Sequence, residues 1–189
     1  MERCAVSNFH LNINSPAENK YLLLLVKINP LIFLFSLFNV STVLVDKVIC
    51  PAQISDEINK KAINIALKTS RVFKHIGLLA IELFLTDNDE ILINEVAPRP
   101  HNSGHHTIRA NMTSQYEQHL RAILDLPLGA TGIIKPAAMV NLLGAEGYKG
   151  PVVYEGIEEA LALGSVFPHI YGKAETKPFR KMGHVTLLA

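Results

Sequence analysis

Cysteine is scarce in this sequence, and neither sign of charge is in excess. The two cysteines among its 189 residues, Cys4 and Cys50, have a spacing that fits neither a disulfide framework nor a metal-binding motif. We therefore expect a protein of the reducing cytoplasm rather than a secreted one. Lysine and arginine (18) nearly balance aspartate and glutamate (17), so the sequence predicts no broad basic surface for nucleic acid. Any anionic ligand must meet a local cluster of basic groups.

We expect no secretory leader, because no apolar stretch with a small-residue cleavage site follows closely on Met1. The sequence also shows no internal repeat and no low-complexity tract. One long apolar run, residues 21–45, has Lys27 as its only charge and is long enough to span a bilayer. Asn29 and Pro30 interrupt the run, and the part that follows is rich in β-branched and aromatic residues. We interpret the run as buried strands rather than a membrane helix.

A helix, a hairpin and a second helix follow this run. Residues 56–74 have the apolar spacing of an amphipathic helix capped by Ser55. Two apolar stretches on either side of residues 87–90 predict a β-hairpin. A capping box of Ser114 and Glu117 opens the second helix. The apolar side chains of this helix, which we expect to face inward, are Tyr116, Leu120, Ile123 and Leu124. Short strands and turns follow, so the sequence predicts an α+β fold with an antiparallel sheet.

Two carboxylates, Glu82 and Glu95, lie in the apolar strands of the predicted hairpin. A four-residue connection, residues 87–90, sets them opposite each other on one face of the sheet. Carboxylates this close repel unless a cation lies between them, and Mg²⁺ takes one or two carboxylates together with phosphate oxygens. The pair predicts a magnesium nucleotide site, supported by Asn94 from the other face. The alternatives are a buried lysine or arginine paired with Glu82, or a register slip that separates the carboxylates.

The loop after the hairpin gathers ionisable groups within residues 98–106. Arg99 can make a planar fork to a carboxylate or phosphate, and His101 can exchange a proton near neutral pH. We interpret this loop as an anion site beside the carboxylates. The alternative is a zinc site at His101, His105 and His106, although no cysteine or H-E-x-x-H arrangement supports it.

A second basic cluster lies near the end of the sequence. Its members are Lys173, Lys177, Arg180, Lys181 and His184. Such groups can grip a phosphate monoester and a carboxylate. A solvated charged face is the alternative interpretation.

Four segments in this order resemble the carboxyaminoimidazole ribonucleotide synthetase family. They are residues 77–82 (GLLAIE), 94–105 (NEVAPRPHNSGH), 113–119 (TSQYEQH) and 172–185, which contains RKMGHV. The resemblance covers about residues 48–188, and the second segment is its most specific part. A chance match of all four in order is not expected.

The resemblance implies the carboxy-terminal half of an ATP-grasp domain in residues 48–129 and a small β-rich lobe in 130–189, after a degenerate apolar segment, 1–47. It implies ATP-dependent carboxylation of aminoimidazole ribonucleotide with bicarbonate in purine biosynthesis, with ATP and Mg²⁺ as cofactors. The implied roles are catalysis by Arg99, His101 and Lys173; nucleotide binding by Asn94 and Glu95; metal binding by Glu82 and Glu95; and substrate binding by Asn102, Ser103, Lys173, Arg180 and Lys181.

Members of this family also carry an amino-terminal lobe and a central nucleotide-clamping lobe, and neither is visible in this sequence. We therefore expect a partial copy whose isolated chain does not hydrolyse ATP in response to the ribonucleotide. The alternatives are a noncatalytic remnant that keeps the fold, and a different ATP-grasp ligase, against which the loop and the RKMGH string argue. The family also implies a homodimer.

Overall fold

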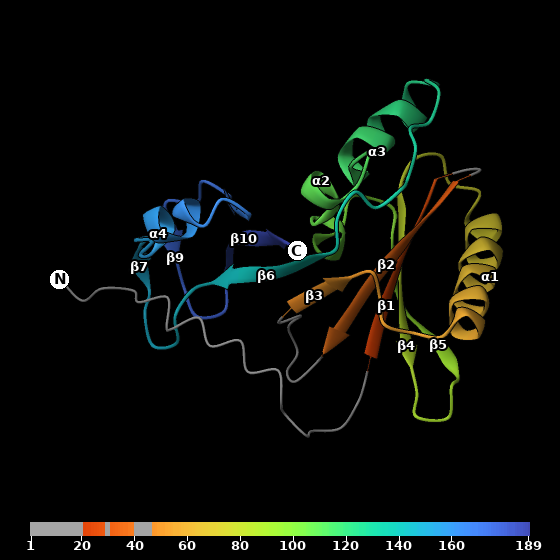
Figure 1. Ribbon diagram of the computed structural model, residues 1–189, viewed down its shortest axis with the longest axis horizontal. Helices are drawn as coiled ribbons and strands as arrows, with labels where there is room; N and C mark the ends of the chain where they lie inside the picture. Colours follow the sequence, from red (N-terminus) through yellow and green to blue (C-terminus); the bar gives the residue numbers. More distant parts are fainter. Residues whose placement is uncertain (1–20, 29–30, 40–46) are drawn as a thin grey trace.

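The computed structural model describes residues 21–28, 31–39 and 47–189. Its main element is an eight-stranded antiparallel sheet (Figure 1). The strand order is β5-β4-β1-β2-β3-β6-β10-β8. These strands are β1 (Tyr21–Ile28), β2 (Leu31–Asn39), β3 (Lys47–Cys50), β4 (Leu79–Leu85), β5 (Ile91–Ala97), β6 (Ala137–Leu143), β8 (Val166–Ile170) and β10 (Lys181–Leu188). The two short strands β7 (Gly150–Pro151) and β9 (Glu175–Thr176) pair separately.

The helices are α1 (Asp56–Phe73), α2 (Thr107–Ala110), α3 (Gln115–Ile123) and α4 (Ile157–Ala162), with a 3₁₀ turn over Asn102–Gly104. The predicted α+β class is confirmed. Within the described ranges, none of these helices has both the length and the apolar character needed to cross a membrane.

The apolar run of residues 21–45 forms strands wherever the structure describes it. β1 pairs with β2 and with β4, so the run joins the sheet beside the predicted hairpin. The prediction of strands rather than a membrane helix is confirmed for residues 21–28 and 31–39. The remaining residues of the run lie outside the described ranges.

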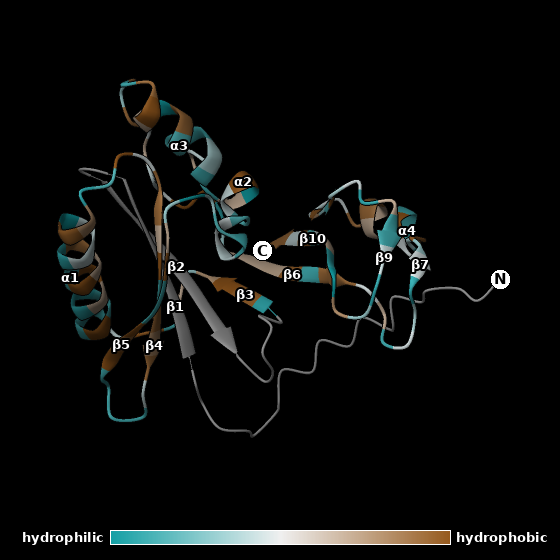
Figure 2. Cartoon of the chain, turned by 180° about the vertical axis from the view of Figure 1, so that it is seen from behind, coloured by the Kyte–Doolittle hydropathy of each residue, from teal (hydrophilic) through white to brown (hydrophobic). Residues whose placement is uncertain are grey.

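Helix α1 begins where its cap predicts. The Ser55 side chain accepts a hydrogen bond from the Ile58 N–H at 3.3 Å, and the helix ends at Lys74 in the left-handed conformation. The buried face of α1, which includes Ala62 and Ala66, packs with apolar side chains of β4. Polar and apolar residues alternate around α1 in Figure 2, as expected for a helix that covers one face of a sheet.

Helix α3 buries the opposite face from the one that its apolar pattern predicts. Gln115 and Gln118 are fully buried, whereas Leu120 is 54% exposed and Ile123 50% exposed. The predicted inward set of Tyr116, Leu120, Ile123 and Leu124 is therefore wrong. The physical reason is that α3 covers loop backbone, whose N–H and C=O groups need polar partners, and the two buried glutamines provide them.

Strands β6 and β10 carry the sheet away from α1 towards α4, β7 and β9 (Figure 1). A separate small core forms there from Leu142, Val166 and Val185. Because β3 pairs with β6, the sheet is continuous across the boundary predicted near residue 129. The division into lobes at that point stays a prediction.

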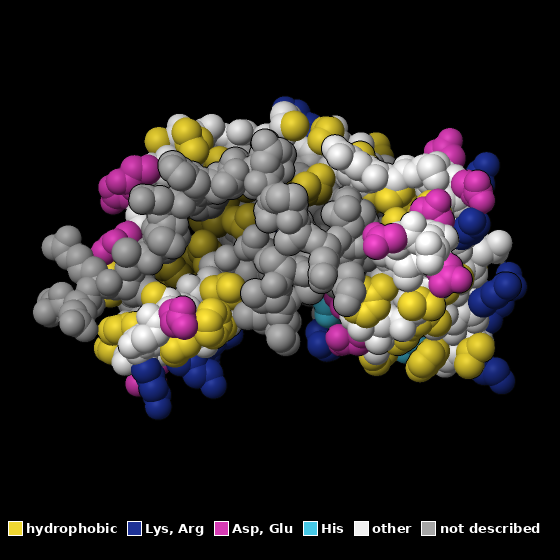
Figure 3. Space-filling model, turned by 90° about the horizontal axis from the view of Figure 1, so that it is seen from below, with side chains coloured by type: hydrophobic (Ala, Val, Ile, Leu, Met, Phe, Trp, Pro, Cys, Tyr) yellow, Lys and Arg dark blue, Asp and Glu magenta, His cyan; other side chains and the backbone are white. Residues whose placement is uncertain are grey.

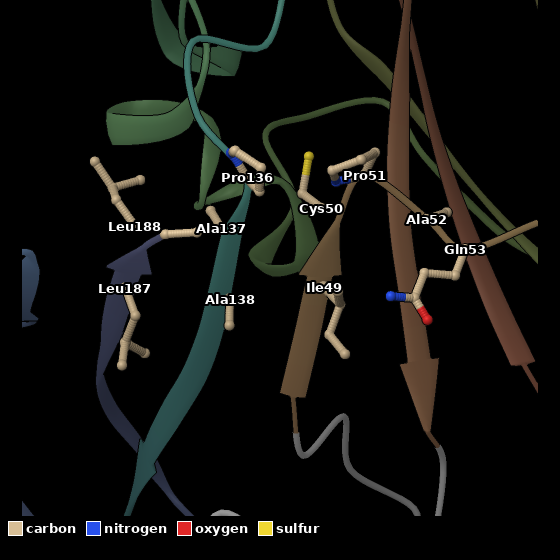
Figure 4. Close-up of a pocket in the computed structure, with 11 residues that line it drawn as sticks. Ile49, Cys50, Pro51, Ala52, Gln53, Pro136, Ala137, Ala138, Leu187 and Leu188 are labelled. Carbon is tan, nitrogen blue, oxygen red and sulfur yellow. The ribbon is translucent and has the colours of Figure 1, made fainter. Parts of the chain in front are cut away.

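A cavity of about 540 Å³ lies at the ends of β3, β6 and β10 (Figure 4). Its walls are mostly apolar and include Ile49, Cys50 and Leu187. Burial raises the pKa of the Cys50 thiol to about 12, so this cysteine is inert near neutral pH. None of the residues predicted for the functional site lines this cavity.

Candidate functional site

Glu82 on β4 and Glu95 on β5 face each other across the hairpin. A carboxylate oxygen of each, together with a ring nitrogen of His101, lie within 4.8 Å of one another. The predicted convergence of the two carboxylates is confirmed, and a register that separates them is excluded. His101 joins the pair as a third potential ligand.

The register that pairs the carboxylates arises in a different way from the one predicted. The Thr86 N–H donates to the Glu90 carbonyl at 3.0 Å, and Asp89 has φ 57°, so the turn is shorter than the predicted connection of residues 87–90. The strands then begin in the register Leu85↔Ile91. Continued without a break, this register would place Asn94 opposite Glu82.

A β-bulge at Asn94 restores the carboxylate pair. The register shifts between Glu82 and Leu83, so that Asn94 and Glu95 together oppose Glu82. The Asn94 side chain donates to Glu82 Oε2 at 3.3 Å. The prediction that Asn94 points to the other face is therefore wrong, because the extra residue of a bulge breaks the strict alternation of side chains.

Glu82 is 6% exposed, and among the described residues Asn94 and Ser103 donate hydrogen bonds to its carboxylate. Ser103 Oγ donates to Oε1 at 3.3 Å, and His101 Nδ1 lies 3.2 Å from the same oxygen. Burial raises the pKa of Glu82, and the charge of Glu95 raises it further, against the opposing effects of Ser103, Asn94 and Lys181. Across the described ranges, the basic side chain within 4 Å of its carboxylate is the His101 ring rather than a lysine or arginine, and this ring is charged only when protonated. A buried carboxylate repelled by a neighbour fits an oxygen-ligated divalent cation.

The loop after β5 places the His101 side chain against this carboxylate pair. Its Nδ1 lies 2.7 Å from Ser103 Oγ, and burial is the main cause that lowers its pKa. Arg99, two residues earlier, is exposed and donates to the Pro100 carbonyl at 3.1 Å. The charge of Arg99 is near enough to contribute to the lowered pKa of His101, and its role in anion binding stays a prediction.

The zinc alternative does not survive the geometry. In the part of the chain that the structure describes, the one three-residue cluster suited to a metal is Glu82, Glu95 and His101. His106 is buried with its Nδ1 bonded to the Ser103 carbonyl at 3.0 Å, and His105 stacks on Tyr116. The three histidines do not converge on a common point.

Part of the second basic cluster meets the loop. Lys181 Nζ donates to Asn102 Oδ1 at 3.2 Å, and burial lowers the pKa of Lys181. Lys173 Nζ donates to the Lys181 carbonyl at 2.5 Å and lies over the ring of Tyr171, 5.6 Å from its centroid. The Tyr171 hydroxyl in turn lies 3.4 Å from Asn102 Nδ2. Lys173 and Lys181 thus lie beside the same loop as His101.

Arg180 has its described contacts elsewhere. Its guanidinium donates to the Glu175 carbonyl at 2.8 Å, and its own carbonyl accepts from Gly144 N–H at 2.9 Å. Lys177 is exposed in the same turn. Figure 3 shows acidic and basic side chains interspersed with hydrophobic ones on the face that it presents, without a continuous basic area. The role of Arg180 in substrate binding stays a prediction.

Three polar residues at this site escaped the sequence analysis. Asn141 Oδ1 accepts from Asn102 Nδ2 at 2.8 Å, and Gln115 bonds the His101 backbone. Tyr171 links Asn102 to His184, whose Nδ1 lies 3.1 Å from its hydroxyl. Asn141 had a usable signal, because it is the one polar residue in the apolar segment AAMVNLL. A polar residue in a buried strand needs a partner.

Imidazole rings in contact connect β8 and β10 to the loop, His169 stacked on His184 and His184 tilted against His105. The His184 ring lies 4.5 Å from that of His169 and 4.8 Å from that of His105, centroid to centroid. Burial, more than the neighbouring rings, lowers the pKa of His105 to about 3 and that of His184 to about 4. These rings are neutral at physiological pH and pack as aromatic groups.

The antiparallel sheet, the paired carboxylates of its edge hairpin and the adjacent anion loop are features of the ATP-grasp class. Residues 40–116 match the ATP-grasp domain family, and residues 137–189 match the phosphoribosylaminoimidazole carboxylase C-terminal domain family. Within this class, the chain matches the carboxy-terminal part of the carboxyaminoimidazole ribonucleotide synthetase family.

Known relatives support this family and show how much of it the chain spans. The N5-carboxyaminoimidazole ribonucleotide synthase of Bacillus subtilis is 47% identical over 140 residues, which are 74% of this chain and 35% of that protein. The phosphoribosylaminoimidazole carboxylase of Saccharomyces cerevisiae is 42% identical over 74% of this chain and 25% of its own length. The chain therefore spans about a quarter to a third of these relatives.

Solved structures share the fold. The N5-carboxyaminoimidazole ribonucleotide synthetase of Thermotoga maritima is 47% identical and superposes with a TM-score of 0.81, over 91% of this chain and 47% of that one. The enzyme of Aspergillus clavatus, in complex with ADP and 5-aminoimidazole ribonucleotide, is 35% identical with a TM-score of 0.78, over 90% and 46% of the two chains. The predicted fold is confirmed.

Proposed function

We propose that this chain forms the carboxy-terminal part of a site that carboxylates aminoimidazole ribonucleotide with ATP and bicarbonate, a step of purine biosynthesis. One observation carries the proposal. Lys181 contacts Asn102, and Asn102 follows His101, which lies against the carboxylate pair. A lysine and the carboxylate pair therefore both contact this loop, which supports an anion site next to a cation site. The related Aspergillus clavatus structure contains ADP and the ribonucleotide together, in agreement with such an arrangement.

The nucleotide side of the proposed site consists of Glu82, Glu95 and Asn94. The two carboxylates would hold Mg²⁺, for which their oxygens and their mutual repulsion are suited. When bound, the ion neutralises charge on the ATP phosphates. Asn94 fixes one oxygen of Glu82 and lies next to Glu95, so the bulge orients both nucleotide-binding residues.

The reaction that this site would support joins a carboxyl group to the ribonucleotide amine in three steps. A bicarbonate oxygen attacks the γ-phosphorus of ATP, and the bond from that phosphorus to ADP breaks. The resulting carboxyphosphate separates into carbon dioxide and phosphate. The amine nitrogen then attacks the carbon of carbon dioxide and loses a proton. Arg99, His101 and Lys173 would hold the bicarbonate and its phosphorylated form during these steps.

The substrate side of the site would hold the ribonucleotide and its phosphate. The residues proposed for it are Asn102, Ser103, Lys173, Arg180 and Lys181. Asn102 and Lys181 already contact each other, and Lys173 supports Lys181. Carbon dioxide released near His101 would then meet the amine beside the same loop, before water can capture it. We place the reaction in the cytoplasm, and we propose a homodimer as in the family.

Calorimetric titration with aminoimidazole ribonucleotide, in the presence and absence of Mg²⁺ and ADP, tests this function. We expect saturable binding that Mg²⁺ and ADP strengthen, and loss of that strengthening in Glu95→Gln. A wild-type chain that binds neither ligand would contradict the proposal. The same samples should be assayed for ATP hydrolysis that depends on the ribonucleotide. Turnover that Glu95→Gln abolishes would assign the complete reaction to this chain.

A further inference from the structure

Gln115, the first residue of α3, holds the backbone of one residue of the anion loop (residues 98–106) at both its N–H and its carbonyl. Its Oε1 accepts from the His101 N–H at 3.0 Å, and its Nε2 donates to the His101 carbonyl at 2.8 Å. The same Nε2 lies 2.8 Å from His105 Nδ1. Because an amide nitrogen can only donate, His105 must accept at Nδ1. The fully buried Gln115 side chain uses both of its donor hydrogens and its acceptor oxygen on this loop.

The residues around Gln115 restrict the position of its side-chain amide. The Ser114 side chain caps α3, and the backbone N–H of Gln115 donates to Thr107 Oγ1 at 2.9 Å. Gly104 lies so near that a Cβ atom on it would be 2.5 Å from Gln115 Oε1. A larger residue at position 104 would therefore displace the amide.

Holding the His101 backbone at both its N–H and its carbonyl fixes the direction in which its ring leaves the chain. The ring then lies with Nδ1 3.2 Å from Glu82 Oε1 and 2.7 Å from Ser103 Oγ. Among the described residues, the short polar contacts of Nδ1 on the ring are with Glu82 and Ser103. The His101 backbone, by contrast, is held by two hydrogen bonds to the same Gln115 side chain. The position of the ring thus depends on a residue that does not touch the carboxylates.

We infer that Gln115 is a positioning residue, whose amide sets His101 against Glu82 and so prepares the loop to receive a carboxylate-bearing anion. The geometric part of this inference stands on the hydrogen bonds alone. Its consequence for anion binding rests on the proposed function. The two parts need separate measurements.

Gln118 provides a matched control on the same helix. It is also fully buried, and it bonds the backbone of Gly129 in the same two-sided way, accepting from the N–H at 2.9 Å and donating to the carbonyl at 2.5 Å. Gly129 belongs to the turn after α3 and not to the predicted site. Replacing either glutamine by methionine removes an equivalent buried clamp, but only Gln115→Met releases His101.

The first experiment measures the contact between His101 and Glu82 by NMR of the His101 ring, assigned by comparison with His101→Gln. We expect Glu82→Gln to shift the ring resonances in the wild type and in Gln118→Met. In Gln115→Met the same substitution should produce less than half of that shift. An undiminished shift in Gln115→Met would overturn the inference and leave Gln115 a merely structural clamp. If Gln115→Met does not fold, Gln115→Glu, which keeps the acceptor oxygen and loses the donors, replaces it.

The second experiment titrates wild type and both variants with phosphonoformate, which joins a carboxylate to a phosphonate, in the presence of Mg²⁺ and ADP. We expect affinity to fall at least tenfold in Gln115→Met and to stay within twofold in Gln118→Met, although both variants melt earlier than the wild type. Equal losses in the two variants would overturn the role in anion binding. A wild-type chain that does not bind phosphonoformate counts against the proposed function, and the NMR comparison then decides the positioning role alone.

Discussion

The buried carboxylate of Glu82 lowers the stability of the fold when it is ionised. Burial and the charge of Glu95 raise its pKa, so the folded state favours the protonated form. A folded pKa above the unfolded value gives stability that is complete below the unfolded pKa and is lost as pH rises through the folded pKa. At neutral pH and without a cation, the ionised Glu82 therefore weakens the fold. Mg²⁺ should recover that loss.

Glu82→Gln tests this cost. In the absence of divalent cations at neutral pH, we expect the variant to melt a few degrees above the wild type, because the neutral amide is cheaper to bury. Addition of Mg²⁺ should raise the Tm of the wild type and leave that of the variant unchanged. Thermal unfolding by circular dichroism measures both effects. A variant that melts below the metal-free wild type would show that the carboxylate stabilises the fold.

His184 gives the fold a dependence on acid. Its folded pKa of about 4 lies below the ordinary value of 6.5, so it contributes stability above pH 6.5 that is lost as pH falls towards 4. Its neighbours His105 and His169 have pKa values lowered in the same direction. In that interval each such group steepens the loss by up to about 1.4 kcal/mol per pH unit.

We expect His184→Gln to flatten the pH dependence of stability between pH 6.5 and 4. The variant should lose some stability at pH 7, where the ring packs between His105 and His169. Urea unfolding at several pH values gives the two free-energy curves. Curves that stay parallel through this interval would mean that His184 does not titrate with unfolding.

At the level of elements, the hairpin shows what a sequence can and cannot specify. Apolar neighbours mark Glu82 and Glu95 as exceptional positions, and this signal predicts the carboxylate pair correctly. The route to the pair could not be predicted, because the sequence Asp87-Asn88-Asp89 suits more than one turn. A shorter turn and the bulge at Asn94 compensate each other by one residue. The sequence analysis missed both the shorter turn and the bulge, and because their effects on the register cancel, the predicted pair of Glu82 and Glu95 is still correct.

Helix α3 marks a second limit. Its capping box predicts where it begins, since the Ser114 side chain accepts from the Glu117 N–H at 3.2 Å. The prediction of its buried face was wrong, because predicting that face from the spacing of apolar residues assumes that the helix packs against an apolar surface. The helix instead packs on loop backbone, which selects Gln115 and Gln118. The residues that hold the site in place were therefore hidden behind an ordinary amphipathic pattern.

The caps of α1 and α3 offer a matched comparison at this scale. Ser55→Ala and Ser114→Ala each remove a side-chain acceptor at a helix start, and each should cost about 1 kcal/mol of stability. Only Ser114→Ala should also shift the ring resonances of His101, because Gln115 follows that cap directly. Urea unfolding and histidine NMR separate the two effects. An equal response of His101 to both variants would refute this link between cap and site.

Across the whole molecule, one sheet carries both halves of the proposed site. β4 and β5 supply the carboxylates at one edge, and β10, which is near the other edge, supplies Lys181. The resemblance assigned Lys181 and Asn102 to one substrate site although they are far apart in the sequence, and the two side chains are in contact. That assignment came from the family resemblance, since the charge pattern alone favours a solvated charged face. Arg180 and Lys181 are neighbours with different contacts, a difference that no charge pattern reveals.

Because Lys181 contacts the loop, we expect its substitution to weaken ligand binding more than substitution of an exposed lysine does. Lys181→Met should weaken binding of aminoimidazole ribonucleotide by about ten- to a hundredfold, since a hydrogen bond to a charged group contributes about 1.5–3 kcal/mol. Lys177→Met removes the same charge from an exposed position a few residues away, and should change affinity by less than about twofold. Calorimetric titration at two salt concentrations completes the test. Any effect of Lys177 should vanish at high salt, whereas that of the half-buried Lys181 should persist because solvent ions screen it less. Equal losses that disappear together in salt would mean that the cluster attracts the substrate only from a distance, and that Lys181 does not bind it.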